Sequence, residues 1–246
     1  MAATCKLGLL LSVLAFQTEP LAEPASDPTY WIVVSPQTRL MAGDTPKGTL
    51  PPGTLLRCTK THGGWRFSIE YRGWVHSNDL VALDQAVAFF SKIIAQKPTA
   101  AAYHHRGIAQ AALERWDEAL RDFQEAARRG DQSSELLINL ANAQRHRGQG
   151  ALAIESYTQA LKQNPLATYA YLHRGSLLAE QGHWEASLKD LQQAAELAPE
   201  SSEVHNHLGV TLRMLGRFEE ALAAYTRALE IVPQDALARA NRAYAL

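Results

Sequence analysis

The feature that most constrains this sequence is an internal repeat of 34 residues, which begins at Ala100 and runs to the last residue. Compared with itself at this offset, the chain shows small, bulky and proline residues at fixed positions, without insertion or deletion. These positions hold Gly107, Ala141, Gly175, Gly209 and Ala243; Phe123, Tyr157, Leu191 and Tyr225; and Pro165, Pro199 and Pro233. A fixed period of this length is typical of architectures that stack one supersecondary unit many times.

Each unit is predicted to be two helices joined by a turn. Apolar residues within one copy follow helical spacing, as at Leu188, Leu191 and Ala195. A glycine stands where the first helix of three copies must end, because glycine adopts a positive φ at little cost. These glycines are Gly148, Gly182 and Gly216. The small residue inside each first helix is expected to let a neighbouring helix approach closely.

A 34-residue unit with this pattern resembles the tetratricopeptide repeat. The resemblance covers residues 99–246, with whole repeats at 100–133, 134–167, 168–201 and 202–235 and a partial one at 236–246. It implies an all-α solenoid of helix-turn-helix units. Residues 84–98 have the apolar spacing of a second helix shifted by one residue, so we expect a half-repeat that caps the solenoid.

The N-terminal part is predicted to be a small β-barrel. Short β-type runs punctuated by glycine and proline fill residues 29–83. Gly73, Trp74 and Val75, followed by a polar turn and Leu80, resemble the bacterial Src-homology-3-like domain. That resemblance implies binding of peptides or of cell-wall peptidoglycan, with Trp65, Tyr71 and Trp74 as candidates for the ligand groove. The alternative is that both tryptophans belong to the core.

The first residues suggest export. The apolar run from Leu7 to Phe16 is too short to span a bilayer but suits the core of a signal peptide. We therefore expect a signal peptide at 1–22, a linker at 23–28, an exported mature chain in the cell envelope or outside the cell, and no membrane span after cleavage. The alternatives are a start codon placed too far upstream and a hydrophobic tail on a cytosolic protein.

Polar residues recur at one position of the first helices and form a candidate peptide-binding ladder. The rungs are His105, Asn139, His173, His207 and Asn241, with Asn142 beside them. First helices about 10 Å apart and a peptide that advances about 3.3 Å per residue give one rung per three peptide residues. Some tetratricopeptide proteins hold peptide backbones with an asparagine ladder at this position, so the resemblance implies the same role. Alternatively, the rungs bond to adjacent helices or are merely solvated.

Several function classes are disfavoured. A net charge of −1 supplies no general attraction for nucleic acid. No nucleophile elbow, phosphate loop or zinc signature occurs, so we expect no enzyme, cofactor or metal site. His205 and His207 lie two residues apart, so they would point in different directions on one helix and could not bind one metal ion together. Arg106, Arg174 and Arg242 are better suited to hydrogen bonds between repeats than to anion binding.

The sequence thus predicts a multidomain β and α chain, a small barrel followed by a helical solenoid, that acts as a non-catalytic scaffold for a protein or peptide partner. A cell-envelope module anchored to peptidoglycan through the barrel is one alternative. Another is the front part of a longer enzyme or sensor, because Leu246 stops midway through a repeat.

Overall fold

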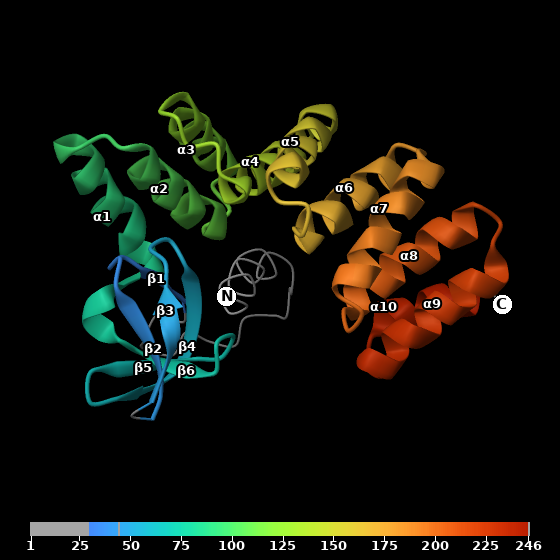
Figure 1. Ribbon diagram of the computed structural model, residues 1–246, viewed down its shortest axis with the longest axis horizontal. Coiled ribbons are helices and arrows are strands. Elements are labelled where there is room, and N and C mark those ends of the chain that lie inside the picture. Colours follow the sequence, from blue (N-terminus) through green and yellow to red (C-terminus); the bar gives the residue numbers. More distant parts are fainter. Residues whose placement is uncertain (1–29, 44, 246) are drawn as a thin grey trace. The chain divides into compact units, whose positions relative to one another are not determined.

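The computed structural model describes residues 30–43 and 45–245, so the predicted signal peptide and linker lie outside the described residues. The chain falls into two compact units, one up to Gln132 and one from Ser133. Unit 1 holds the strands and the first three helices, and unit 2 holds the remaining helices (Figure 1).

Seven described strands form one sheet in unit 1, in the order β3, β2, β6, β5, β4, β1, β7. Their bounds are β1 Tyr30–Val33, β2 Thr38–Ala42, β3 Thr45–Leu50, β4 Leu55–His62, β5 Trp65–Ser68, β6 Gly73–His76 and β7 Leu80–Ala82. Each pairing in this order is antiparallel. One side of the sheet buries Val33, Leu50, Leu56 and Val75, with Cys58 partly buried beside them as a core residue.

The predicted closed barrel is wrong, because no pairing among the described strands joins β3 to β7. β3 is exposed along most of its length and contains Pro46, which has no N–H to donate to a further strand. At the other edge, helix α1 (Leu83–Gln96) follows β7 directly. Phe90 of α1 packs in one cluster with Ile32 and Leu55, so a helix rather than another strand covers this apolar surface.

The repeats form consecutive helix pairs, as their spacing predicted (Figure 1). The pairs are α2 (Ala100–Ala112) with α3 (Trp116–Arg128), α4 (Ser134–His146) with α5 (Gly150–Gln163), α6 (Thr168–Glu180) with α7 (Trp184–Leu197), and α8 (Ser202–Met214) with α9 (Phe218–Ile231), followed by α10 (Ala236–Tyr244). Side chains of Thr99, Ser133, Ser201 and Asp235 cap the first helices by accepting a backbone N–H.

The small residue of the first helix is needed for close packing inside each pair. A Cβ added to Gly107 would lie 2.5 Å from the ring of Phe123, and one added to Gly209 would lie 2.6 Å from the ring of Tyr225. Both aromatic side chains are fully buried. The expectation that these positions allow close helix approach is confirmed.

The turn glycines adopt the positive φ that the sequence predicted, with φ of 71° at Gly148 and 74° at Gly216. The first repeat has Glu114 at the equivalent place, and its φ is 59°. An L-residue in this region costs about 1 to 2 kcal/mol, and Glu114 is exposed, so its side chain has little packing to offset this cost.

We expect Glu114→Gly to stabilise the chain by about 0.5 to 1 kcal/mol, since relief of the backbone cost exceeds the added entropy of the unfolded glycine. The reciprocal change, Gly148→Ala, should destabilise by about 1 to 2 kcal/mol, although no atom lies within 4 Å of the new Cβ. Urea unfolding followed by circular dichroism measures both. Shifts in the same direction would show that backbone conformation does not control these turns.

Candidate functional site

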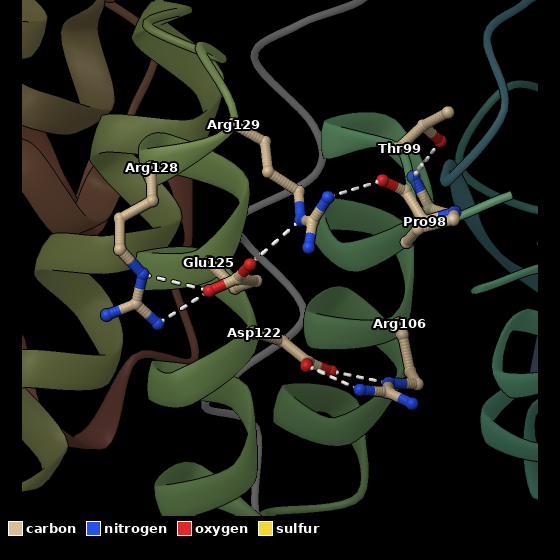
Figure 2. Close-up of polar contacts among 8 residues, drawn as sticks. Pro98, Thr99, Arg106, Asp122, Glu125, Arg128 and Arg129 are labelled. Carbon is tan, nitrogen blue, oxygen red and sulfur yellow. Dashed lines mark hydrogen bonds and ion pairs between the residues drawn. The ribbon is translucent and has the colours of Figure 1, made fainter. Parts of the chain in front are cut away.

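Arg106 makes structural hydrogen bonds in unit 1, one of them outside its own repeat, as predicted, and two within it. Arg106 on α2 donates two hydrogen bonds of 2.7 Å to the carboxylate of Asp122 on α3 (Figure 2). A third guanidinium nitrogen donates to the hydroxyl of Ser91 on α1 at 3.0 Å. The hydrogen bond to Asp122 raises the pKa of Arg106. Because bidentate pairs of this kind are strong and directional, Arg106 holds three helices together rather than binding a ligand.

A second polar cluster lies one turn further along α3. Glu125 accepts hydrogen bonds from Arg128 and Arg129 at 2.8 Å (Figure 2). Arg129 also donates to the carbonyl of Pro98, which precedes α2. These contacts lower the pKa of the Glu125 carboxyl, with Arg128 contributing most. The cluster fixes the end of α3 against the start of α2.

Unit 2 contains an equivalent arginine–aspartate pair. Arg174 on α6 donates two hydrogen bonds of 2.7 Å to Asp190 on α7 and one of 2.9 Å to Thr158 on α5. The sequence predicted the arginines but not their acidic partners. The sequence does contain a signal for these pairs, because in both repeats the aspartate follows its arginine by 16 residues.

The first rung of the predicted ladder, His105, packs against a loop and helix α1 of unit 1. A Cβ added to Gly53, in the loop before β4, would lie 2.5 Å from the imidazole of His105. The Phe90 ring lies 5.5 Å from the imidazole, centroid to centroid. Burial, together with the neighbouring His104, lowers the pKa of His105 to about 4. A ligand would have to displace this loop to reach the rung from the side of Gly53.

Two further ladder residues are bonded within unit 2. Asn142 accepts a short hydrogen bond from the hydroxyl of Tyr157 on α5. Asn241 on α10 donates to the side-chain oxygen of Asn206 on α8 at 2.9 Å. For these two residues the structure shows the contacts with adjacent helices that the alternative interpretation expected.

The remaining rungs, Asn139, His173 and His207, come from α4, α6 and α8. Asn139 and His207 are half-buried, whereas His173 is only 7% exposed. Arg145 on α4 donates to Nδ1 of His173 at 2.8 Å. Since Nδ1 accepts, the proton of the neutral imidazole resides on Nε2. Nε2 is buried and has no hydrogen-bond partner among the residues that the structure describes.

Other polar side chains surround this pair. We call Arg145, His146, Tyr169, His173, Glu203 and His207 the Arg145 cluster. The ring of Tyr169 lies 3.8 Å from that of His173, centroid to centroid. Burial lowers the pKa of His173 well below its usual value, and the charge of Arg145 and the neighbouring His207 and His146 lower it further.

His207 and Glu203 of the cluster also have shifted pKa values. Burial and then the charge of Arg145 lower the pKa of His207. Loss of hydration raises the pKa of Glu203, while Arg145 opposes this shift. Both histidines are therefore neutral at pH 7, and Arg145 supplies the positive charge near them.

The three aromatic candidates of the sheet separate onto two sides. Trp65 pairs with His76, and Phe67 pairs with Trp74, across β5 and β6. Because residues directly opposite each other, or two apart on a strand, point the same way, these four rings share one face. The ring centroids lie 5.0 Å and 5.3 Å apart in the two pairs. Both tryptophans are half-buried, so neither is a fully buried core residue.

Tyr71 packs against the core on the other side, with Val33 and Val75. Burial, reinforced by the charge of Glu70, raises the pKa of Tyr71 to about 12. Tyr71 therefore does not share a surface with Trp65 and Trp74.

Within residues 30–43 and 45–245, no group of three or more histidine, cysteine, aspartate or glutamate side chains could hold a metal ion. The same part of the chain has no helix of sufficient length and apolarity to traverse a bilayer.

A family model described as tetratricopeptide repeat matches residues 104–168, 138–185 and 172–236, which together span more than half of the chain. The chain belongs to the tetratricopeptide repeat family. No curated protein matches it significantly.

Solved tetratricopeptide repeat structures share the fold. YrrB, described as a tetratricopeptide repeat protein with an unusual peptide-binding site, is 27% identical with a TM-score of 0.59, over 67% of this chain and 84% of YrrB. MamA from Desulfovibrio magneticus is 24% identical with a TM-score of 0.55, over 59% of this chain and 82% of MamA. Part of a repeat protein from Cytophaga hutchinsonii is 20% identical with a TM-score of 0.58, over 66% of this chain and 65% of that one.

Arg145 is the residue of this tetratricopeptide repeat site that sequence reasoning missed. It lies six residues after the rung Asn139 and so does not follow the ladder spacing. Its long side chain nevertheless reaches His173 on the next first helix. Its position in the last turn of α4 was visible in the sequence, and a cation interacts favourably with the helix dipole there.

Proposed function

We propose that this tetratricopeptide repeat protein is a non-catalytic scaffold that binds an extended peptide segment along α4, α6 and α8 of unit 2. The observation that carries the proposal is the convergence of polar side chains from these three successive first helices at His173. Membership of the family and the likeness to YrrB, whose description names a peptide-binding site, support it.

The ladder in this proposal is shorter than the one drawn from sequence. His105 packs against the loop at Gly53, and Asn142 and Asn241 are bonded inside unit 2. In this proposal Asn139 and His207 hold the peptide backbone, and His173 lies between them on α6. Side chains with both donor and acceptor capacity suit that task, because each peptide unit presents one of each.

We expect a displayed library of short peptides to yield binders of the full chain that are lost from the double variant Asn139→Ala and His207→Ala. Removing two hydrogen-bonding side chains should weaken binding about ten-fold or more. The matched control carries Gln159→Ala and Lys162→Ala, two exposed positions on the second helix α5. Calorimetric titration of selected peptides, with helicity checked by circular dichroism, measures the difference.

Equal binding by the double variant and the wild type would overturn this assignment.

Cell-wall anchoring through the sheet is the second candidate, and the shared face of Trp65 and Trp74 favours it. Retention of the full chain on isolated cell wall, abolished by Trp65→Ala but not by the ladder variant, would move the function to the sheet. Export of the chain remains a prediction.

A further inference from the structure

The Arg145 cluster contains a polar group that the described residues leave unsatisfied. Arg145 donates to Nδ1 of His173, so Nε2 carries the proton, and this N–H is buried without a partner in residues 30–43 and 45–245. A buried donor left unpaired is costly, because it has lost its hydration without gaining a hydrogen bond, and such groups are uncommon in folded proteins. The unsatisfied donor therefore points to an acceptor that the described part of the chain does not supply.

The charges around this donor favour an anionic acceptor. Arg145 lies within hydrogen-bond distance of His173, and its charge also lowers the pKa of His207 on α8. The carboxyl of Glu203 is the one acidic group of the Arg145 cluster, and burial raises its pKa despite the charge of Arg145. A carboxylate next to Arg145 and the Nε2–H of His173 would receive charge-assisted hydrogen bonds.

We propose that His173 and Arg145 bind the carboxylate of an aspartate or glutamate side chain within the bound peptide. The inference rests on the proposed function, because it names the chemistry of the peptide that the ladder holds. An internal side chain, rather than a chain terminus, fits the placement of the site. His173 is the middle of three rungs, with Asn139 on α4 before it and His207 on α8 after it, so the peptide continues in both directions.

The test uses hexapeptide pools blocked at both ends, with glutamate, aspartate, glutamine or lysine fixed at one position, and the full chain as receptor. We expect the acidic pools to bind about ten-fold or more tightly than the glutamine pool, the range of a hydrogen bond to a charged group. Arg145→Met should remove this preference, whereas Arg227→Met should not. Arg227 is a matched control, since it is a cation of unit 2 that contacts Glu200 and Glu230 away from the cluster.

Two further variants separate this role from a structural one. Glu203→Gln removes the competing carboxylate and should tighten binding of the acidic pools. His173→Gln places an amide nitrogen near the position of Nε2 and should retain part of the preference. A long-range nitrogen spectrum of the imidazole should show the Nε2–H tautomer and a shift of that nitrogen when an acidic pool is added.

Each outcome decides the proposal. Equal binding of the glutamate and glutamine pools would overturn it and leave the proposed peptide function standing. No binding by any pool would overturn both. A pool with a free C-terminal carboxylate, or acetate alone, that competes as well as the acidic pools would show a site for terminal or free carboxylates and overturn the assignment to an internal side chain.

Discussion

Asp190→Ala is expected to destabilise the chain by about 3 to 5 kcal/mol, because it leaves the Arg174 guanidinium without its partner in a largely desolvated position. The side chains of Arg174 and Asp190 are 19% and 8% exposed, and two hydrogen bonds of 2.7 Å join them. The remaining bond from Arg174 to Thr158 cannot neutralise the charge. Urea unfolding at pH 7, followed by circular dichroism, measures the loss.

The matched control is Glu220→Ala, which breaks the pair with Arg217 on the surface at α9. Exposed pairs contribute about 0 to 1 kcal/mol, so this variant should unfold almost like the wild type. Replacing both buried partners, by Arg174→Met with Asp190→Leu, should recover much of the loss, because no charge is then left unpaired. A loss below about 1 kcal/mol for Asp190→Ala would show that water solvates Arg174 in its place.

The helical part of the fold was accessible from sequence because its determinants are local. The 34-residue spacing of small, aromatic and proline residues fixes where each helix begins and ends, and the bounds of α2 to α9 follow it. A glycine at the turn indicates a positive φ, which Gly148 adopts. The same reasoning did not anticipate Glu114, whose side chain gives no sign of a positive φ.

The sheet was less accessible, because closure depends on what covers its edges and faces. Alternation along β4 puts Leu56 and Cys58 on the core side of the sheet. It could not show that α1 would pack on Ile32 and Leu55. The grouping of Tyr71 with the tryptophans likewise relied on residue type, whereas the pairing of β5 with β6 decides which side chains share a face.

For the ladder, spacing identifies the motif position but not the contacts made there. His105 meets a loop more than 50 residues earlier in the chain, at Gly53. Asn241 meets Asn206 across 35 residues. Contacts between elements distant in sequence depend on how the helices pack, so equivalent positions acquire different surroundings. Peptide binding by Asn139, His173 and His207 stays a prediction.

Tyr157→Ala is expected to cost about 3 to 5 kcal/mol, the usual range for removal of a buried aromatic side chain. Tyr157 is fully buried in the cluster that includes Ala141 and Leu161. Leu152→Ala on the same helix is the control, because Leu152 is 49% exposed and should change stability by less than about 0.5 kcal/mol. The free energy of unfolding in urea measures both, and similar losses for the two variants would place the core of unit 2 elsewhere.

Tyr157→Phe separates the packing of this ring from its hydrogen bond. The variant keeps the apolar volume and removes the hydroxyl that donates to Asn142, so the loss should be about 0.5 to 1.5 kcal/mol. The ring also lies 6.2 Å from the imidazole of His173, centroid to centroid. Because the ring itself remains, His173 should keep its position, and peptide binding in the library experiment should be unchanged. Weakened binding by Tyr157→Phe at retained helicity would instead show that the Asn142 contact helps to shape the ladder.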